Sequence, residues 1–216
     1  MKKLFLLVML LALASCSKPN SSSSTASFVS SSEISSSSET IESKNEIIIL
    51  AGQSNMVGYT EWAPLKRDKE FDYNSYNGTA KNVKIISFCE SRKWDDHFQD
   101  VTFGFGLSST YFGPEIGLAH KLAEDPNTNY YFVKVAWGGT ALAEEWLSPT
   151  SASNEGREVG FLYERMLDEV EIAIKLLKKD YGIEDYSISS FCWMQGEQDG
   201  TQKANAEVYA TRLSNF

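Results

Sequence analysis

Four short runs of apolar residues predict β-strands, because they are rich in the β-branched and aromatic residues that favour strands. They span residues 46–51, 83–88, 130–136 and 186–194. The first run reads Ile-Ile-Ile-Leu-Ala after its glutamate, with no polar residue in alternate positions. That pattern is typical of a strand buried on both faces of a parallel sheet.

Apolar residues at helical spacing predict helices between these strands. Residues 163–179 have apolar side chains on one face of the predicted helix and charged side chains on the opposite face. A second helix is expected over residues 114–122, where Pro114 occupies a position favoured in a first turn. Strands that alternate with helices predict an α/β fold with a parallel sheet and right-handed crossovers.

The start of the chain predicts an export signal, because Lys2 and Lys3 precede an apolar stretch that ends in Leu-Ala-Ser-Cys at Cys16. The stretch is shorter than the ~20 residues that span a bilayer. The tetrapeptide resembles the bacterial lipobox, so we expect residues 1–15 to be a lipoprotein signal peptide and Cys16 to be lipidated. An ordinary cleaved signal with a chance cysteine is the alternative.

Residues 16–44 are mostly serine and contain too few apolar residues to offset the entropy lost on ordering. We expect a disordered tether with a reach of about 30 Å. Residues 45–216 then form one domain of ordinary size.

The formal net charge of −9 argues against nucleic-acid binding, because phosphates are bound by Lys and Arg. The chain has three cysteines. Cys89 and Cys192 lie in or beside strand-like runs, and we expect them to be buried free thiols rather than a disulfide.

Polar sequences that contain glycine follow three of the four strands, where ligands bind in open α/β sheets. They are Gly-Gln-Ser-Asn-Met at 52–56, Trp-Gly-Gly-Thr at 137–140 and Gln-Gly-Glu at 195–197, whereas the strand at 83–88 is followed by Cys89 and Glu90. Ser54 falls in the first turn of the next helix, where backbone N–H groups stabilise negative charge. Taken alone, a serine at such a position is more often a helix cap.

Together these motifs resemble the sialate O-acetylesterase and carbohydrate esterase family 6 branch of the SGNH hydrolases. The likeness covers nearly all of residues 47–216 and includes Gly-Pro-Glu at 113–115, Trp146, and the sequence Trp-Met-Gln-Gly-Glu-Gln-Asp at 193–199. The resemblance implies a three-layer αβα sandwich, flavodoxin-like, with strand order 2-1-3-4-5. In that order the strands of Cys89 and Cys192 are three places apart, which argues against a disulfide.

The resemblance also implies roles for particular residues. Ser54 would be the nucleophile, with its own N–H as one oxyanion donor, and Gly139, or less favourably Gly138, would give a second. Gln195 would supply a third donor through its amide. The residues expected around them, as substrate contacts or supports, are Gln53, Asn55, Trp137, Gly138 and Glu197.

Some residue roles stay open. Glu197 either orients a neighbouring group, such as the loop of Ser54, or only packs in its own loop. Trp62, Trp137 and Trp146 either offer faces to sugar rings or pack in the protein, and Trp137 is the best candidate for sugar.

Neither histidine of the chain, His97 or His120, matches the Asp-x-x-His sequence of the family. We therefore expect the catalytic Asp and His beyond Phe216, with a further strand before them, so that the chain is an incomplete domain, inactive by itself. No metal is expected, because His, Cys and carboxylates lack ligand spacing, and no nucleotide cofactor, because phosphate-binding loops are absent after the strands.

Two functions remain. The first is a serine esterase that removes O-acetyl groups from sialic acid or another glycan through an acyl-enzyme. The second is a non-catalytic carbohydrate-binding lipoprotein of the same fold. In either case we expect a protein of the bacterial cell envelope that is lipid-anchored and faces the periplasm or the exterior.

Overall fold

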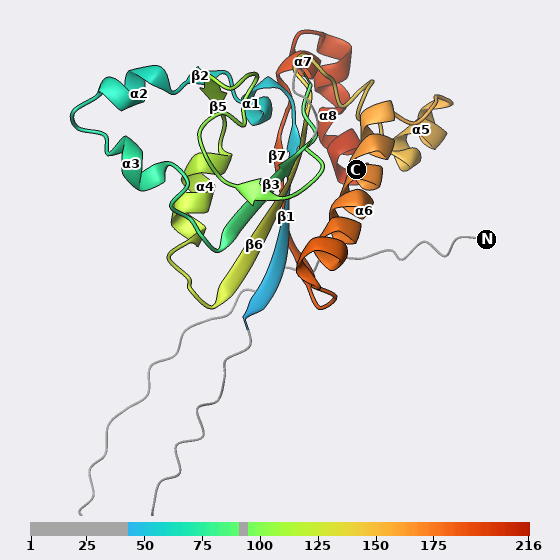
Figure 1. The fold of residues 1–216 in the computed structure, drawn as a ribbon. Coiled ribbons are helices and arrows are strands. Elements are labelled where there is room, and N and C mark those ends of the chain that lie inside the picture. The colour runs from blue at the N-terminus through green and yellow to red at the C-terminus, as the bar shows by residue number, and fades with distance from the viewer. Residues whose placement is uncertain (1–42, 91–94) are drawn as a thin grey trace, which may run out of the picture. The chain divides into compact units, whose positions relative to one another are not determined.

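The computed structural model describes residues 43–90 and 95–216, so the predicted signal peptide, Cys16 and almost all of the predicted tether lie outside the described residues. Four parallel strands form the centre of the fold, with order β3-β6-β1-β7 (Figure 1). They are β1 (Lys44–Gly52), β3 (Val83–Ser87), β6 (Thr128–Ala136) and β7 (Ser187–Met194). A short strand β4 (Gln99–Asp100) adds antiparallel to β3. The predicted strands and the α/β class are confirmed.

The expected strand order 2-1-3-4-5 is wrong in one respect. The third predicted strand, β6, lies between the second, β3, and the first, β1. All of its residues from Tyr130 to Ala136 are buried, and it pairs with β1 over nine residues and with β3 over five. Such burial suits a strand that has long neighbours on both sides. β3, by contrast, pairs on its other side only with the two-residue strand β4. The strands before Ser54, Gly139 and Gln195 are still neighbours, with that of Ser54 in the middle.

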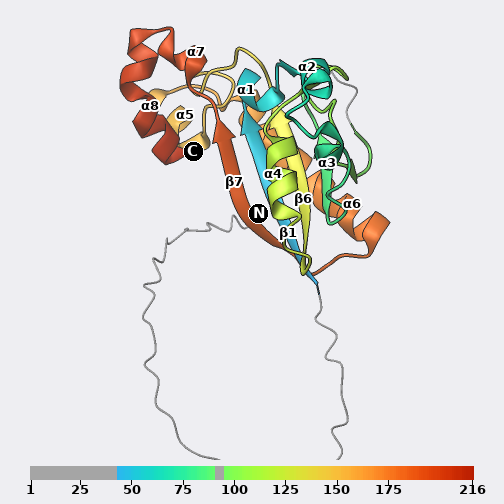
Figure 2. The same ribbon diagram turned by 90° about the vertical axis from the view of Figure 1, so that its left-hand side faces the viewer.

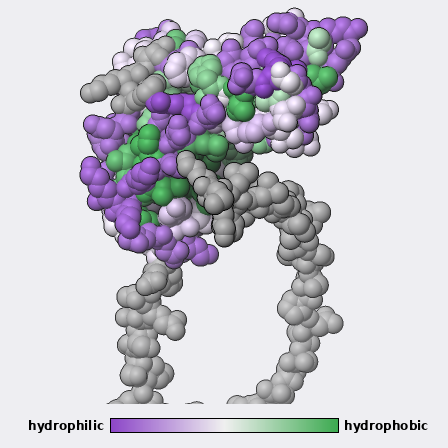
Figure 3. All heavy atoms as spheres, turned by 90° about the vertical axis from the view of Figure 1, so that its right-hand side faces the viewer, coloured by the Kyte–Doolittle hydropathy of each residue, from purple (hydrophilic) through white to green (hydrophobic). Residues whose placement is uncertain are grey.

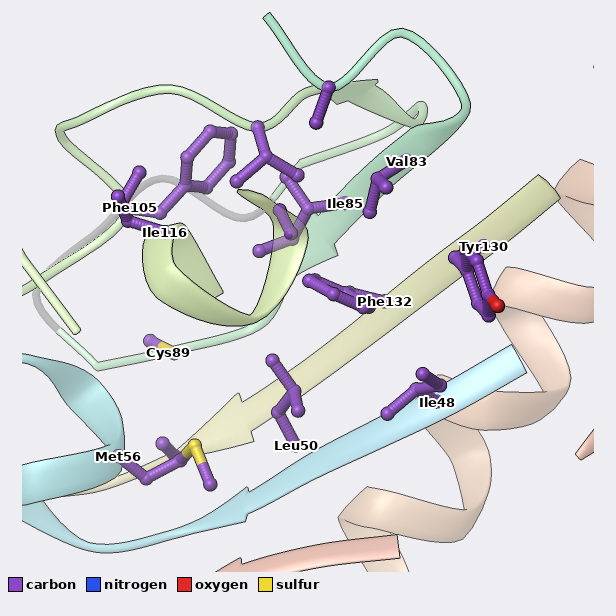
Figure 4. Close-up of a cluster of buried hydrophobic side chains, with 14 of the residues drawn as sticks. Ile48, Leu50, Met56, Val83, Ile85, Cys89, Phe105, Ile116, Tyr130 and Phe132 are labelled. Atoms are coloured by element: carbon purple, nitrogen blue, oxygen red, sulfur yellow. The ribbon is translucent and has the colours of Figure 1, made fainter. Parts of the chain in front are cut away.

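One face of the sheet is covered by α4 (Glu115–Leu122) and α1 (Ser54–Val57). Ile116 of α4 and Met56 of α1 belong to one buried cluster with Leu50 and Phe132 of the sheet, and Figure 4 shows Met56 on the side of Leu50 and Ile116 beside Phe105. The chain between α1 and α4 adds two short helices and a pair of two-residue antiparallel strands on this side (Figure 1). They are α2 (Ala63–Arg67), α3 (Tyr73–Tyr76) and the pair β2 (Thr60–Glu61) and β5 (Tyr111–Phe112).

The long helix α6 (Phe161–Tyr181) covers the opposite face, which completes three layers. Leu162, Met166 and Leu177 project from α6 into the second half of the core, as the helical spacing predicts. The helices α5 (Pro149–Glu155) and α8 (Lys203–Asn215) pack against each other, and α7 (Glu197–Gly200) joins β7 to α8 (Figure 2). Arg212 of α8 holds Glu155 of α5 through two hydrogen bonds of 2.8 and 2.9 Å.

β7 forms one edge of the sheet and is more exposed than its neighbours. Ile188, Phe191 and Met194 are each about 40% exposed. Figure 3 shows a face on which hydrophobic side chains reach the surface between polar ones. Within the described ranges, no helix combines the length and the apolar character that crossing a membrane requires.

Both cysteines of the described chain are free thiols, as expected. Cys89 is fully buried, and this burial raises the pKa of its thiol. Cys192 is partly buried on β7 and its pKa is raised for the same reason. Both sulfurs therefore stay protonated near neutral pH and behave as small apolar groups.

An ion pair lies within the core between β6 and α4, where Lys134 and Glu115 are both 0% exposed. The Nζ of Lys134 donates to Glu115 at 2.7 Å and to the carbonyl oxygens of Val57 and Phe105, each at 2.9 Å. Glu115 also accepts the N–H of Gly113 at 2.8 Å. All three ammonium protons therefore have acceptors, which is the condition for a charge to be buried at tolerable cost.

We expect Lys134→Met to lower the free energy of unfolding by about 3–5 kcal/mol, because it leaves the Glu115 carboxylate buried without its cation. Replacing both partners, in Lys134→Met/Glu115→Leu, should recover part of this loss. The control is Lys84→Met at the partly exposed pair with Asp100, for which we expect a change of at most about 1 kcal/mol. Urea unfolding followed by circular dichroism measures all three, and equal losses for the two single variants would contradict the expectation.

Candidate active site

Ser54 follows the carboxyl end of the central strand β1, and the two residues before it, Gly52 and Gln53, are bonded to the ends of both neighbouring strands. The N–H of Gln53 donates to the carbonyl of Met194 in β7 at 2.9 Å, and the N–H of Trp137, just after β6, donates to the carbonyl of Gly52 at 3.0 Å. Ser54 is the first residue of α1 and is partly exposed. The loops after β1, β6 and β7 therefore meet at one end of the sheet, as the sequence predicts.

The two glycines after β6 differ in what their N–H groups do. That of Gly138 donates to Oε1 of Glu90 at 2.6 Å. Among the described residues, the N–H of Gly139 has no acceptor. Gly139 has φ +69°, in the left-handed region that favours glycine. Of these two glycine N–H groups, only that of Gly139 is left for a ligand oxygen by the described residues.

The side chain of Gln195 is bonded within the protein. Its Nε2 donates to Asp199 at 2.7 Å and to the carbonyl of Thr140 at 2.9 Å, and its Oε1 accepts the hydroxyl proton of Tyr209 at 3.0 Å. An amide nitrogen has two protons, so both are used. For Gln195 to donate to an oxyanion as well, one of these bonds would have to be given up.

Gln53 and Asn55, which flank Ser54, both connect to α7. Oε1 of the buried Gln53 accepts the N–H of Gln198 at 3.2 Å. The Asn55 amide donates to the carboxylate of Glu197. Glu197 thus contacts the loop of Ser54 as the orienting interpretation requires, and its role stays a prediction.

Three side chains of this site, those of Tyr59, Glu90 and Asp199, had no role predicted from the sequence. Glu90 also accepts the hydroxyl proton of Tyr59 at 3.3 Å, and the pKa of Tyr59 is raised by burial and then by this carboxylate. Asp199, which is fully buried, accepts hydrogen bonds from the loop after β6 and from Gln195. Asp199 stands inside the recognised motif, so a signal for it was present, whereas Glu90 had none.

Neither histidine is hydrogen-bonded to Ser54, and within residues 43–90 and 95–216 the Ser54 hydroxyl has no partner at all. The ring of His120 stacks on Tyr76, with centroids 3.9 Å apart. His97 pairs with its neighbour Asp96 at 2.6 Å in an exposed position. The described part of the chain also holds no group of three or more His, Cys, Asp or Glu residues that could bind a metal ion.

Of the three candidate tryptophans, two pack within the protein. Trp146 is 0% exposed and donates to the Thr140 hydroxyl at 2.8 Å. Trp62 donates to the carbonyl of Ser109 and contacts the ring of Tyr73. Trp137 is only partly buried and lies against the exposed Phe161, with ring centroids 6.5 Å apart. Trp62 is partly buried as well, and the role of Trp137 in binding sugar stays a prediction.

A cavity of about 480 Å³ opens next to Asn55. Its walls combine an amide, aromatic rings and apolar atoms, a composition common in sites for small organic ligands. They are formed by Asn55, Gly58, Tyr59, Thr60, Phe112, Gly113, Pro114 and Met194.

A sequence profile of the carbohydrate esterase family described as sialic acid-specific acetylesterase matches residues 44–216. The chain belongs to this family. The expected kinship with sialate O-acetylesterases is thereby confirmed. Among curated proteins, none matches the chain in sequence.

Solved structures similar to this member of the acetylesterase family include a protein of Arabidopsis thaliana, with 24% identity and a TM-score of 0.49 over 80% of this chain and 66% of that one. NanS shares 16% identity, with a TM-score of 0.47 over 81% of this chain and 59% of that one. A carbohydrate acetylesterase from Xanthomonas citri shares 18% identity, with a TM-score of 0.43 over 80% and 36%. The chain thus spans less than two thirds of the length of each.

We expect Gly52→Ala to destabilise the protein by about 1–3 kcal/mol, the range usual for overpacking. A Cβ at Gly52, where φ is +148°, would stand 2.2 Å from the carbonyl oxygen of Met194, a backbone atom that can move only with β7. The matched control is Gly117→Ala in α4, where a Cβ meets nothing within 4 Å, and which should stabilise by up to about 1 kcal/mol. Thermal unfolding measures both, and a Gly52→Ala variant as stable as the parent would show that the strand ends separate freely.

Proposed function

We propose that the protein is an acetylesterase that removes O-acetyl groups from carbohydrate, with Ser54 as the nucleophile. Membership of the acetylesterase family supports the reaction class. The observation that carries the proposal is the meeting of the Ser54 turn and the Gly139 turn at neighbouring strand ends, with the N–H of Gly139 unused by the described residues.

In the proposed reaction, the Ser54 oxygen attacks the acetyl carbonyl carbon while its proton passes to a general base. The N–H groups of Ser54 and Gly139 stabilise the negative charge that develops on the carbonyl oxygen. Collapse of this intermediate breaks the bond between the acetyl carbon and the sugar oxygen, the base gives its proton to that oxygen, and Ser54 is left acetylated. Water then attacks the acyl-enzyme while the base takes its proton, and the base passes this proton to the Ser54 oxygen as acetate leaves. The general base in this proposal is the histidine of the Asp-x-x-His sequence of the family, because neither His97 nor His120 is bonded to Ser54.

The proposed substrate is an O-acetylated glycan or sialic acid outside the cytoplasm. The cavity beside Asn55, at about 480 Å³, has the room for a sugar ring. Tyr59 contributes a half-exposed aromatic ring to that cavity, and aromatic rings together with a few polar groups suit the mixed faces of a sugar.

We expect Ser54→Ala to abolish hydrolysis of p-nitrophenyl acetate by the full-length protein and to leave its circular dichroism spectrum unchanged, because a partly exposed serine contributes little to stability. Ser214→Ala, at an exposed position of α8, is the matched control and should keep full turnover.

Turnover retained in Ser54→Ala would rule out the nucleophile. If neither the parent nor the variant hydrolyses any acetyl ester, yet both bind acetylated glycan, the non-catalytic binding protein is the correct function.

We also propose that Cys16 carries a lipid anchor and that the domain faces the periplasm or the exterior of a bacterial envelope. The support is the sequence at residues 1–16 and the serine-rich stretch that follows it. One acyl chain binds membranes only marginally, so stable anchoring requires the several chains of a lipoprotein cysteine.

We expect the mature protein to partition into the detergent phase of a Triton X-114 extract, and Cys16→Ala to partition into the aqueous phase or to remain unprocessed. Cys192→Ala is the control, since it removes a cysteine of the folded domain and should leave partitioning unchanged. The same partitioning for Cys16→Ala and for the parent would rule out the anchor.

A further inference from the structure

The loop after β6, residues 137–143, has most of its backbone N–H groups bonded to side-chain carboxylates. Four of its seven N–H groups have such acceptors, at 2.6, 2.8, 2.7 and 3.0 Å. The pairs are Gly138 with Glu90, Ala141 with Glu145, and Leu142 and Ala143 with Asp199. The N–H of Trp137 goes to the carbonyl of Gly52.

Two N–H groups of this loop, those of Gly139 and Thr140, are left without an acceptor among the described residues. They are adjacent, and Gly139 has the left-handed φ of +69°. The carboxylates therefore determine which N–H groups of the loop are available to an oxyanion. A donor in an oxyanion hole is effective only when it is held in place before the charge develops.

Asp199 makes the most connections of the three carboxylates and is the only one that is 0% exposed. Its Oδ2 accepts from Leu142 at 2.7 Å and from the Gln195 amide at 2.7 Å, and its Oδ1 accepts from Ala143 at 3.0 Å. Gln195 in turn donates to the carbonyl of Thr140 at 2.9 Å. Asp199 therefore holds the loop directly at 142–143 and indirectly at Thr140.

We propose that Asp199 is a positioning residue, which fixes the loop after β6 so that the N–H of Gly139 is presented to the oxyanion. This inference rests on the proposed function, because it concerns the oxyanion of that reaction. Asp199 does not touch the substrate. It acts through Leu142, Ala143 and Gln195.

The hydrogen-bond donors around Asp199 explain why a carboxylate is required at this position. An ionised carboxylate accepts hydrogen bonds at both oxygens and donates none, and here all three neighbours are donors. In Asp199→Asn one oxygen becomes an NH2 group, which would face an N–H of the loop or the amide of Gln195. The side chain keeps its volume, but at least one buried donor loses its acceptor.

We expect Asp199→Asn to lower kcat for p-nitrophenyl acetate by about 100-fold, because a misplacement of about 1 Å in a catalytic group has an effect of this size. KM should stay within a small factor of the parent value, since the loss concerns charge that exists only in the transition state. Asp199→Glu, which restores the carboxylate on a longer stem, should recover part of kcat.

The matched control is Asp125→Asn in the full-length protein. Asp125 likewise accepts a backbone N–H, that of Asn127 at 3.0 Å, and the hydroxyl proton of Thr128 at 2.8 Å, but it precedes β6 and therefore lies at the opposite end of the sheet from the loop after β6. We expect its kcat to be unchanged. A fall in kcat for Asp199→Asn alone supports the positioning role, whereas an unchanged kcat, or equal falls in both variants, overturns it.

Hydrogen exchange of the parent protein decides the matter if Asp199→Asn does not fold. We expect slow exchange at Leu142 and Ala143 and fast exchange at Gly139. Equal exchange at the three amides would overturn the proposal.

Ser54→Ala separates this inference from the function on which it rests. Turnover retained in Ser54→Ala would reject the esterase assignment itself. An inactive Ser54→Ala beside a fully active Asp199→Asn would reject only the positioning role.

Discussion

The buried carboxylate of Asp199 is the constraint on which the candidate site depends. A charge that is 0% exposed is tolerated in a protein only when hydrogen bonds replace the water that it has lost. Here those bonds come from the loop after β6 and from Gln195, and Gln195 is also within 3.3 Å of Gln53, the residue before Ser54. The solvation of one side chain thereby fixes three loops relative to one another.

Acidic groups near an oxyanion hole would ordinarily oppose catalysis. In this site the carboxylates of Glu90, Glu145 and Asp199 each accept a backbone N–H of the loop after β6, and Glu197 accepts the amide of Asn55. Part of their charge is offset by the partial positive charge of these donors. The same hydrogen bonds also order the loop. The bonds that make the site rigid are therefore the bonds that reduce the unfavourable effect of the carboxylate charges.

The sequence predicted the strands, the main helices and the meeting of the Ser54, Gly139 and Gln195 loops, because these depend on local hydrophobic patterns and on motifs at strand ends. It could not predict that β6 lies between β1 and β3, since an apolar run shows that a strand is buried but not which strands flank it. The contacts of Glu90 with Gly138 and of Asp199 with Leu142 were also out of reach. They join residues 48 and 57 positions apart, and no local pattern encodes such pairs.

The turn that carries Ser54 is held at both of its ends by hydrogen bonds to other elements. Val57, at the end of α1, has its carbonyl bonded to the ammonium group of Lys134, which is paired with Glu115 within the core. Gln53, at the start of the same turn, is bonded to β7 and to α7. A four-residue helix has too few internal hydrogen bonds to be stable alone, so its geometry must come from these external bonds. The position of Ser54 therefore depends on the buried ammonium group of Lys134, which holds the end of α1, and on the bonds of Gln53, which hold its start.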